Sequence, residues 1–516
     1  MFELDARRSA DPLAWWYPVH LRAPLAASDA DLRATLRAHV MVTEGPERPA
    51  GGHTLVSDEV TEDELREAYR QNRPMLSVRQ LREALADVAR VPSMTDGFLR
   101  GRVTVGDRAA LTELKQAPEC LEMNLSPGLL EAFVASPMAA GVRRLWLKSD
   151  GTLAAGDAKA LVGLFEATPA LEALATHRVP IDAETLRAWA RHPPKALRGL
   201  LLQMVSLANA GDGEALRALA LEAGLRRLVV HHANLGDGGA RELFEGARPF
   251  EHLEGLSLSE SEVGDAGVRA LATLAHARGL PALRRLRIFG SDGRRVSDDG
   301  ALALAASGLE RLSLLDLGLQ NLTHVGANAL LSGALTGLRH VQLRVDTSNG
   351  PLQVGEAGPA VEELVLTGAL ASTHAPRWAG SRVLASVRKL RLDDVRPALL
   401  APLLAEAMPR LERLQLRFGL AHQATALKAL RTAKPAGTPR LVELSLGGLK
   451  LDAKHADALA KSPLFQQLRA LLLEGRSEED AAVRFEQDGL RVRTHEHGWS
   501  FPEAPHDLDG LDALVR

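Results

Sequence analysis

The chain has 516 residues, a formal net charge of −3 and a pI near 6.6, so it can form a large core and is not a globally basic nucleic-acid binder. Its single cysteine, Cys120, excludes an intrachain disulfide and a multi-cysteine metal site. Aromatic residues make up only 4% of the sequence, so we expect a core of Leu, Val and Ala.

The chain starts with charged residues and no apolar run follows them, so we expect no signal peptide. No stretch approaches the roughly 18 apolar residues of a membrane helix. The default expectation is a cytoplasmic protein that does not associate with membranes.

Residues 1–117 lack the repeat described below and are predicted to be mainly helical. The expected elements are helices over 28–40, 61–69 and 77–88, a strand over 101–105 and a helical turn over 109–114. The second helix opens on the capping box Thr61-Glu-Asp-Glu64. We interpret this region as a cap, because the end of a repeat array needs a polar cover. A separate function of the region is the alternative.

From about residue 120 the pattern apolar-x-x-apolar-x-apolar recurs, as in Leu225-Arg-Arg-Leu228-Val-Val230. Its copies begin at 120, 142, 171, 197, 225, 253, 283, 309, 338, 361, 387, 411, 441 and 468, with a mean spacing of about 27 residues. Each copy predicts a short strand. After several copies a Gly-Asp turn precedes Leu and Ala at helical spacing, so each unit should be a strand, a turn and a helix. The Asp or Ser of each turn, such as Asp237, Asp265 or Ser297, is expected at the N-cap of its helix.

These hexads and Gly-Asp turns resemble the ribonuclease-inhibitor-like class of leucine-rich-repeat proteins, over about residues 118–495. The resemblance implies an α/β fold: a right-handed, horseshoe-shaped solenoid with a parallel concave sheet and outer helices. The proportions resemble those of large repeat proteins of myxobacteria, which implies a bacterial type. The cysteine-rich repeats of the vertebrate inhibitors are absent, so their partner does not carry over. Residues 496–516 are expected to form a C-terminal cap.

The second residue of the hexads alternates in charge from Arg226 to Glu412, with Arg284 and Glu310 among its members. Equivalent positions on neighbouring strands lie about 5 Å apart, so opposite charges there attract. We interpret this ladder as support for strand register rather than as a ligand site.

Alternate strand residues should line the concave surface, at three positions in each of thirteen units. Eleven of these positions are basic and four acidic, a balance of +7 against −3 for the whole chain. A basic concave face favours an acidic protein partner, although abundant arginine alone could produce the same count. The residues predicted to bind the partner are Trp146, Arg227, Arg285, Arg287, Phe289, Arg311, Arg344, Lys389, Arg391, Arg413 and Arg417.

Motifs for enzyme chemistry are missing from the sequence. It contains neither a phosphate-binding loop nor a zinc-binding H-E-x-x-H helix, and His495-Glu-His497 lacks a clear third metal ligand. The pair His231-His232 is interpreted as surface residues at a strand end, and Cys120 as a small buried side chain. We therefore predict no catalytic residues, no cofactor and no metal.

The predicted function is a non-enzymatic scaffold that binds an acidic protein surface on its concave face. The alternative is a regulator that activates a small GTPase, as one eukaryotic family with this repeat type does, although we identify no functional loop arginine for that role. Nucleic-acid binding is disfavoured because the concave positions carry no tyrosine on which bases could stack.

Overall fold

The computed structural model describes residues 54–56, 75–77, 102–114, 117–118, 120–290, 296–346, 350, 352–353, 358–368, 381–419, 422–474, 485 and 490–495. Two units are distinguished: one of Met1–Thr104 with Pro118–Glu122, and one of Val105–Ala117 with Met123–Arg516. Strands β1 (Thr54–Val56) and β2 (Met75–Ser77) of the first unit form a parallel pair. The helices expected over 28–40, 61–69 and 77–88, apart from Ser77 in β2, and the C-terminal cap lie outside the described residues.

One sheet of 16 strands runs through the chain, and its strands follow one another in sequence order. The strands are β3 (Arg102–Val105), β4 (Cys120–Asn124), β5 (Arg144–Lys148), β6 (Ala173–His177), β7 (Gly199–Gln203), β8 (Arg227–His231), β9 (Gly255–Ser259), β10 (Arg285–Phe289), β11 (Leu314–Thr323), β12 (His340–Asp346), β13 (Glu363–Thr367), β14 (Lys389–Val395), β15 (Arg413–Phe418), β16 (Glu443–Gly447), β17 (Ala470–Glu474) and β18 (Arg491–His495).

Helices connect most of these strands. They are α4 (Arg108–Glu113), α5 (Leu129–Ala135), η2 (Pro137–Gly141), α6 (Ala155–Val162), α7 (Leu164–Ala167), α8 (Ala183–Arg191), α9 (Asp212–Glu222), α10 (Gly236–Phe244), α11 (Asp265–His276), α12 (Asp298–Ala305), α13 (His324–Leu331), α14 (Arg382–Ser386), η3 (Pro397–Leu399), α15 (Leu400–Ala405), α16 (Gln423–Thr432), α17 (Ala453–Ala460) and α18 (Pro463–Gln466).

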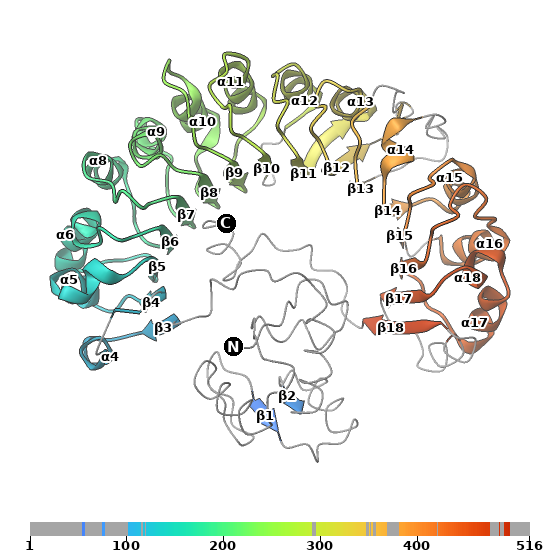
Figure 1. The fold of residues 1–516 in the computed structure, drawn as a ribbon, viewed down its shortest axis with the longest axis horizontal. Coiled ribbons are helices and arrows are strands. Elements are labelled where there is room, and N and C mark those ends of the chain that lie inside the picture. The colour runs from blue at the N-terminus through green and yellow to red at the C-terminus, as the bar shows by residue number, and fades with distance from the viewer. Residues whose placement is uncertain are drawn as a thin grey trace, which may run out of the picture. The chain divides into compact units, whose positions relative to one another are not determined.

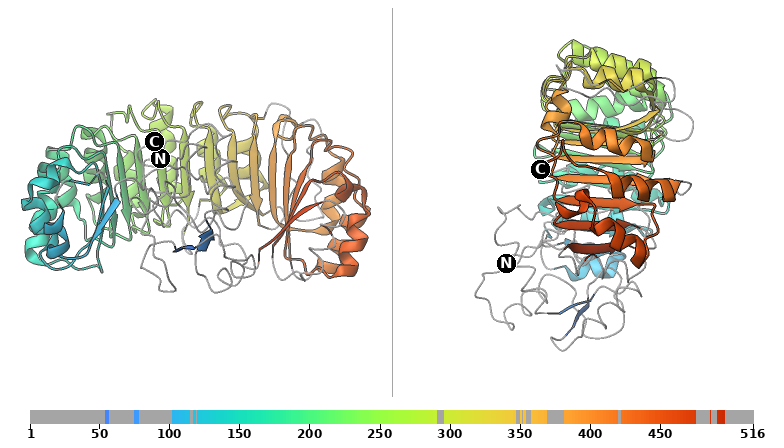
Figure 2. Two further views of the ribbon diagram at one scale, coloured as in Figure 1. Left: turned by 60° about the horizontal axis from the view of Figure 1, so that its bottom comes forward. Right: turned by 90° about the vertical axis from the view of Figure 1, so that its right-hand side faces the viewer.

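In the second unit the strands line the inner side of an arc and the helices stack along its outer side (Figures 1 and 2). From β5 to β18 every neighbouring pair of strands is parallel. A parallel open sheet with one connection of this kind per strand is the architecture that the repeat predicts. The fold is a leucine-rich-repeat solenoid.

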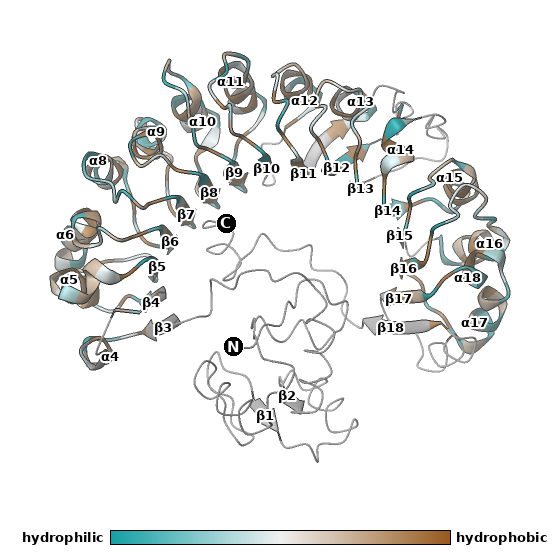
Figure 3. Cartoon of the chain, viewed as in Figure 1, coloured by the Kyte–Doolittle hydropathy of each residue, from teal (hydrophilic) through white to brown (hydrophobic). Residues whose placement is uncertain are grey.

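The core is a thin layer between strands and helices. In β8, for example, Leu228 and Val230 are buried with 1% and 0% of their surface exposed, and α10 adds buried Ala240 and Leu243. Strands and helices alike carry apolar residues (Figure 3). Most of the buried apolar side chains are Leu, Val and Ala, as the low aromatic content predicts. Among the described residues, no helix is long and apolar enough to span a membrane.

Two hexads are shifted from the predicted register. In β4 the buried pair is Leu121 and Met123, whereas Leu125, expected in the core, is only half-buried and donates its amide to Lys148 O of β5. The second shift involves the unit expected at 309. Its strand pairs Leu314 with Arg285, so its hexad begins at Leu312 rather than at Leu309. In the other twelve units from 142 onward, the strand begins at the third hexad residue as expected.

The N-cap prediction is confirmed for Ser297, whose hydroxyl accepts from the Asp299 amide at the start of α12. It is wrong for the aspartates, which do not cap their own helices. They lie inside their helices and accept hydrogen bonds from the start of the next helix. Asp265 Oδ1 accepts from the amides of Ser297 (2.8 Å) and Gly300 (3.0 Å), and its Oδ2 accepts from Ser297 Oγ at 2.6 Å. Asp237 and Asp298 make the corresponding bonds one unit before and one unit after. The carboxylates thus accept hydrogen bonds from helix-start amides that have no partner within their own helix. Their negative charge also offsets the partial positive charge at the start of that helix.

The charge ladder is only partly present. Ion pairs across adjacent units join Arg143 to Glu172, Arg226 to Glu254 (3.8 Å) and Arg388 to Glu412 (3.0 Å). The register shift places Ser313, not Glu310, beside Arg284, and the Ser313 amide donates to Arg284 O. The alternation predicted from Arg226 to Glu412 is therefore interrupted at this unit.

Candidate binding face

The concave face is built from the first, third and fifth residues of each five-residue strand. Side chains alternate along a strand, so Leu228 and Val230 of β8 enter the core while Arg227, Val229 and His231 take concave positions. The parallel register aligns these positions into three rows that cross the sheet, as in the pairing of Arg227 with Gly255.

Ten of the eleven predicted binding residues occupy concave positions, and their exposure differs along the array. In the first half, Trp146 and Arg227 are buried, with 7% and 8% exposed. Phe289 of β10 is also buried, at 8%. From β10 onward the basic side chains of the predicted set reach solvent. The exposed or half-buried members are Arg285, Arg287, Arg344, Lys389, Arg391, Arg413 and Arg417.

Arg311 was predicted at a concave position, and that placement is wrong. It lies in the turn before β11, because the strand begins three residues later than expected. The concave positions of this unit are instead Leu314, Asp316 and Gly318. Two overlapping hexads, from Leu309 and from Leu312, fit the sequence, and the structure uses the second. The corrected count is ten basic and five acidic positions, a balance of +5 rather than +7.

Most of the basic residues in the second half are paired with carboxylates on the same face. The pairs are Arg287 with Asp316 (3.1 Å), Lys389 with Glu363 (3.6 Å), Arg391 with Asp393 (2.8 Å) and Arg413 with Glu443 (3.0 Å). His340 adds a contact to Glu363 at 3.5 Å, and its hydrogen bond is the largest cause that lowers the pKa of Glu363. The face is therefore a network of alternating charge rather than a plain basic stripe.

Asp316 is the most deeply buried carboxylate of this network. Only 4% of its surface is exposed, and burial raises its pKa from 3.8 to about 6, although Arg287 opposes this shift. The Gly318 amide also donates to Asp316 Oδ1 at 3.1 Å. The sequence prediction missed this residue because the shifted hexad assigned it to a turn.

Three arginines differ from the rest. Within the described part of the chain, Arg285, Arg344 and Arg417 have no carboxylate within ion-pair distance. Arg285 and Arg344 are exposed and Arg417 is half-buried. Their guanidinium groups can bind carboxylates of another molecule without breaking an internal pair. They are the part of the predicted set that is best placed for recognition.

The interpretation of His231-His232 as surface residues is half wrong. His231 occupies the last position of β8 and is buried with 5% exposed, while His232 is half-buried. The His232 Nε2 atom lies 2.9 Å from Glu260 Oε2 of the next unit. The side chains of Cys120, His495 and His497 lie outside what the structure describes.

No protein-family model matches the chain, and no curated protein matches it either. Solved structures give weak similarities. The crystal structure of the Rad7 and Elc1 complex in yeast has a TM-score of 0.37 and 17% identity, over 70% of this chain and 82% of that chain. The crystal structure of the TLR13–ssRNA13 complex has a TM-score of 0.39 and 17% identity, over 73% of this chain and 57% of that chain. The fold assignment rests on the strand order and register described above.

Proposed function

We propose that the protein is a non-enzymatic scaffold that binds an acidic protein surface on the concave face of β10–β15. The observation that supports this is the presence of Arg285, Arg344 and Arg417 on a face whose other charges neutralise one another. Arg344 and Arg417 lie three strands apart, which is roughly 14 Å. A partner would need carboxylates at a matching spacing. The ribonuclease-inhibitor-like and bacterial type and the cytoplasmic location remain predictions from the sequence.

The paired residues have a different role in this proposal. Arg287, Lys389, Arg391 and Arg413 hold the face in a fixed charge pattern, and a partner would have to displace an internal carboxylate to use them. The free energy needed to break the internal ion pair would offset part of the binding free energy gained from the new contact. The unpaired arginines should therefore contribute most of the electrostatic attraction.

The test compares three charge reversals on the concave face with three on the helices. The first protein carries Arg285→Glu, Arg344→Glu and Arg417→Glu. The control carries Arg241→Glu, Arg269→Glu and Lys428→Glu, which are exposed positions of α10, α11 and α16 with the same change in net charge. Proteins captured from an extract of the source cells are identified, purified and titrated against each variant.

The concave variant should bind the purified partner at least about tenfold more weakly, and the loss should shrink at high salt. The control should bind as the unchanged protein does. A partner lost only with the helix variant would contradict the proposal. The GTPase alternative predicts instead that the unchanged protein accelerates GTP hydrolysis by a member of a GTPase panel.

A further inference from the structure

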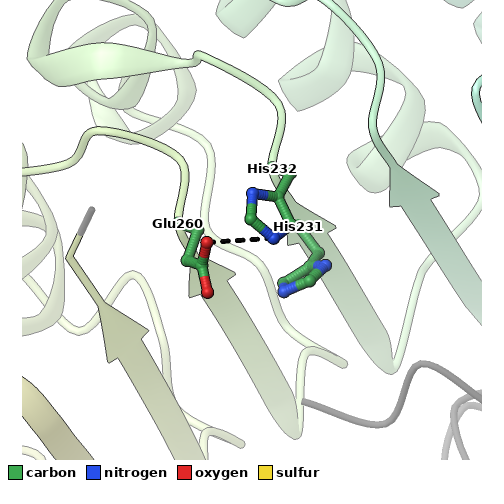
Figure 4. Close-up of side chains that lie close together, drawn as sticks. All are labelled: His231, His232 and Glu260. Carbon is green, nitrogen blue, oxygen red and sulfur yellow. Dashed lines mark ion pairs between the residues drawn. The ribbon is translucent and has the colours of Figure 1, made fainter. Parts of the chain in front are cut away.

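Three potential metal ligands meet where β8 and β9 end: His231, His232 and Glu260 (Figure 4). The ligand atoms of these side chains all lie within 4.8 Å of one another. The two imidazole rings are 4.3 Å apart between centroids and are nearly perpendicular, at 75°. Imidazole nitrogen and carboxylate oxygen are typical ligands of zinc and related divalent ions. It is the one such group of three found among the described residues.

The backbone explains why two consecutive histidines face the same place. In an extended strand, consecutive side chains point to opposite faces. His232, however, has a positive φ of 49°, which turns the chain directly after β8. Glu260 has the same φ of 49° at the equivalent place after β9. The amides of both residues still bond to the next strand, His232 to Ser259 O at 3.0 Å and Glu260 to Phe289 O at 2.8 Å.

This left-handed conformation favours glycine, and other units use glycine there. Gly368 and Gly448 take the corresponding positions after β13 and β16, with φ of 99° and 74°. Arg178 after β6 and Met204 after β7 take the same conformation, with φ of 55° and 53°, so the turn belongs to this stretch of repeats. At His232 and Glu260 this turn carries side chains that can ligate a metal.

We propose that His231, His232 and Glu260 form a binding site for a divalent transition-metal ion of the Zn²⁺ class. Bonds of about 2.0–2.1 Å in a tetrahedral site put ligand atoms roughly 3.4 Å apart, so ligand atoms that lie within 4.8 Å of one another need to close by at most about 1.4 Å. The His232–Glu260 pair, at 2.9 Å, already lies within this separation. Three protein ligands leave the fourth position of the ion open to water or another exchangeable ligand.

The experiment measures binding of Zn²⁺ alone to the full chain after treatment with a chelator. We expect one equivalent to bind at this site, and Co²⁺ in its place to give the visible absorption of a four-coordinate ion. Zn²⁺ should also raise the unfolding temperature of the unchanged protein, because it binds only the folded site. Two variants, His232→Gly and Glu260→Gly, remove one ligand each while suiting the local backbone, so both should fold.

Each variant should weaken Zn²⁺ binding at this site by more than about tenfold, since loss of even an outer-shell partner costs 10–100-fold. The matched control is His340→Ala, which removes a histidine from a pair with Glu363 that lacks a third ligand. A second control removes His495 and His497 together. The proposal is wrong if the unchanged protein binds Zn²⁺ no better than His232→Gly, or if only removal of the two tail histidines abolishes binding.

Discussion

The units from β8 to β12 and those from β13 to β16 share one architecture but are joined by different contacts. In the first group, aspartates of α10, α11 and α12 accept hydrogen bonds from the amides that begin the next helix. In the second group, the neighbouring strands are linked by largely exposed ion pairs, such as Lys389–Glu363 and Arg413–Glu443. The helices differ as well, since α11 has 12 residues and α14 only five.

The physical consequences of the two kinds of contact differ. Bonds from a carboxylate to otherwise unpaired amides are directional, and their loss leaves the amides unsatisfied. Exposed ion pairs are screened by salt and contribute little to stability. Mutations at the helix junctions of the first group should therefore destabilise the protein far more than mutations in the ion pairs of the second.

Asp265→Ala should have the largest effect. The substitution removes the acceptor of the Ser297 and Gly300 amides and of the Ser297 hydroxyl. We expect a loss of about 2–4 kcal/mol in the free energy of unfolding, measured by urea denaturation. Asp299→Ala is the control, because Asp299 also lies in a first helical turn, that of α12, but makes none of these bonds to the next unit. Equal losses from both substitutions would contradict the role of the junction.

Asp316, in β11 of the first group, should make the stability of the protein depend on pH. Its folded pKa of about 6 exceeds the unfolded value of 3.8, so the folded state holds the proton more tightly. The contribution of this carboxyl is therefore fully present below about pH 4 and is lost as the pH rises through about 6, by at most about 3 kcal/mol. The Asp316→Asn variant should lack this component of the pH dependence. If the unchanged protein and Asp316→Asn show the same dependence of unfolding free energy on pH, the predicted contribution of Asp316 is wrong.

Gly213→Ala tests the close approach of two helices in the first half of the array. A Cβ atom on Gly213 of α9 would overlap the carbonyl oxygen of Gly239 in α10. The helix backbones must then move apart, and we expect a cost of about 1–3 kcal/mol in unfolding free energy. Gly238→Ala in α10 is the control, because nothing lies within 4 Å of a Cβ there. A smaller loss of unfolding free energy for Gly213→Ala than for Gly238→Ala would contradict the close contact between the backbones of α9 and α10.

The position of most strands can be predicted from the sequence. The hexad places apolar residues three and then two positions apart, and few other segments of each unit fit this spacing. This spacing does not decide between overlapping hexads. Starting at Leu309 or at Leu312 gives the same two spacings to the neighbouring units, 26 and 29 residues, in opposite order. The strand pairing distinguishes them, because Arg285 pairs with Leu314 and Arg287 with Asp316 across the sheet. The error moved Arg311 onto the concave face and left Asp316 out.

Two other features of the site depend on contacts that a local pattern does not contain. An aspartate near the start of a helix is equally suited to cap its own helix or the neighbouring one, and Asp265 does the latter. The alternation rule predicts that His231 and His232 point apart, but the positive φ of His232 brings them together. The sequence signal that could have indicated this is the glycine at equivalent positions of later units, such as Gly368.

Arg413→Ala should have the smallest effect, although Arg413 belongs to the predicted binding set. Its pair with Glu443 is 3.0 Å long, but about half of the Arg413 side chain is exposed, at 53%. We expect a loss below about 1 kcal/mol in unfolding free energy that disappears at about 1 M salt. A double-mutant cycle with Glu443→Ala isolates the pair. A coupling energy comparable to the loss from Asp265→Ala, persisting in high salt, would show that both groups of units are held together equally strongly.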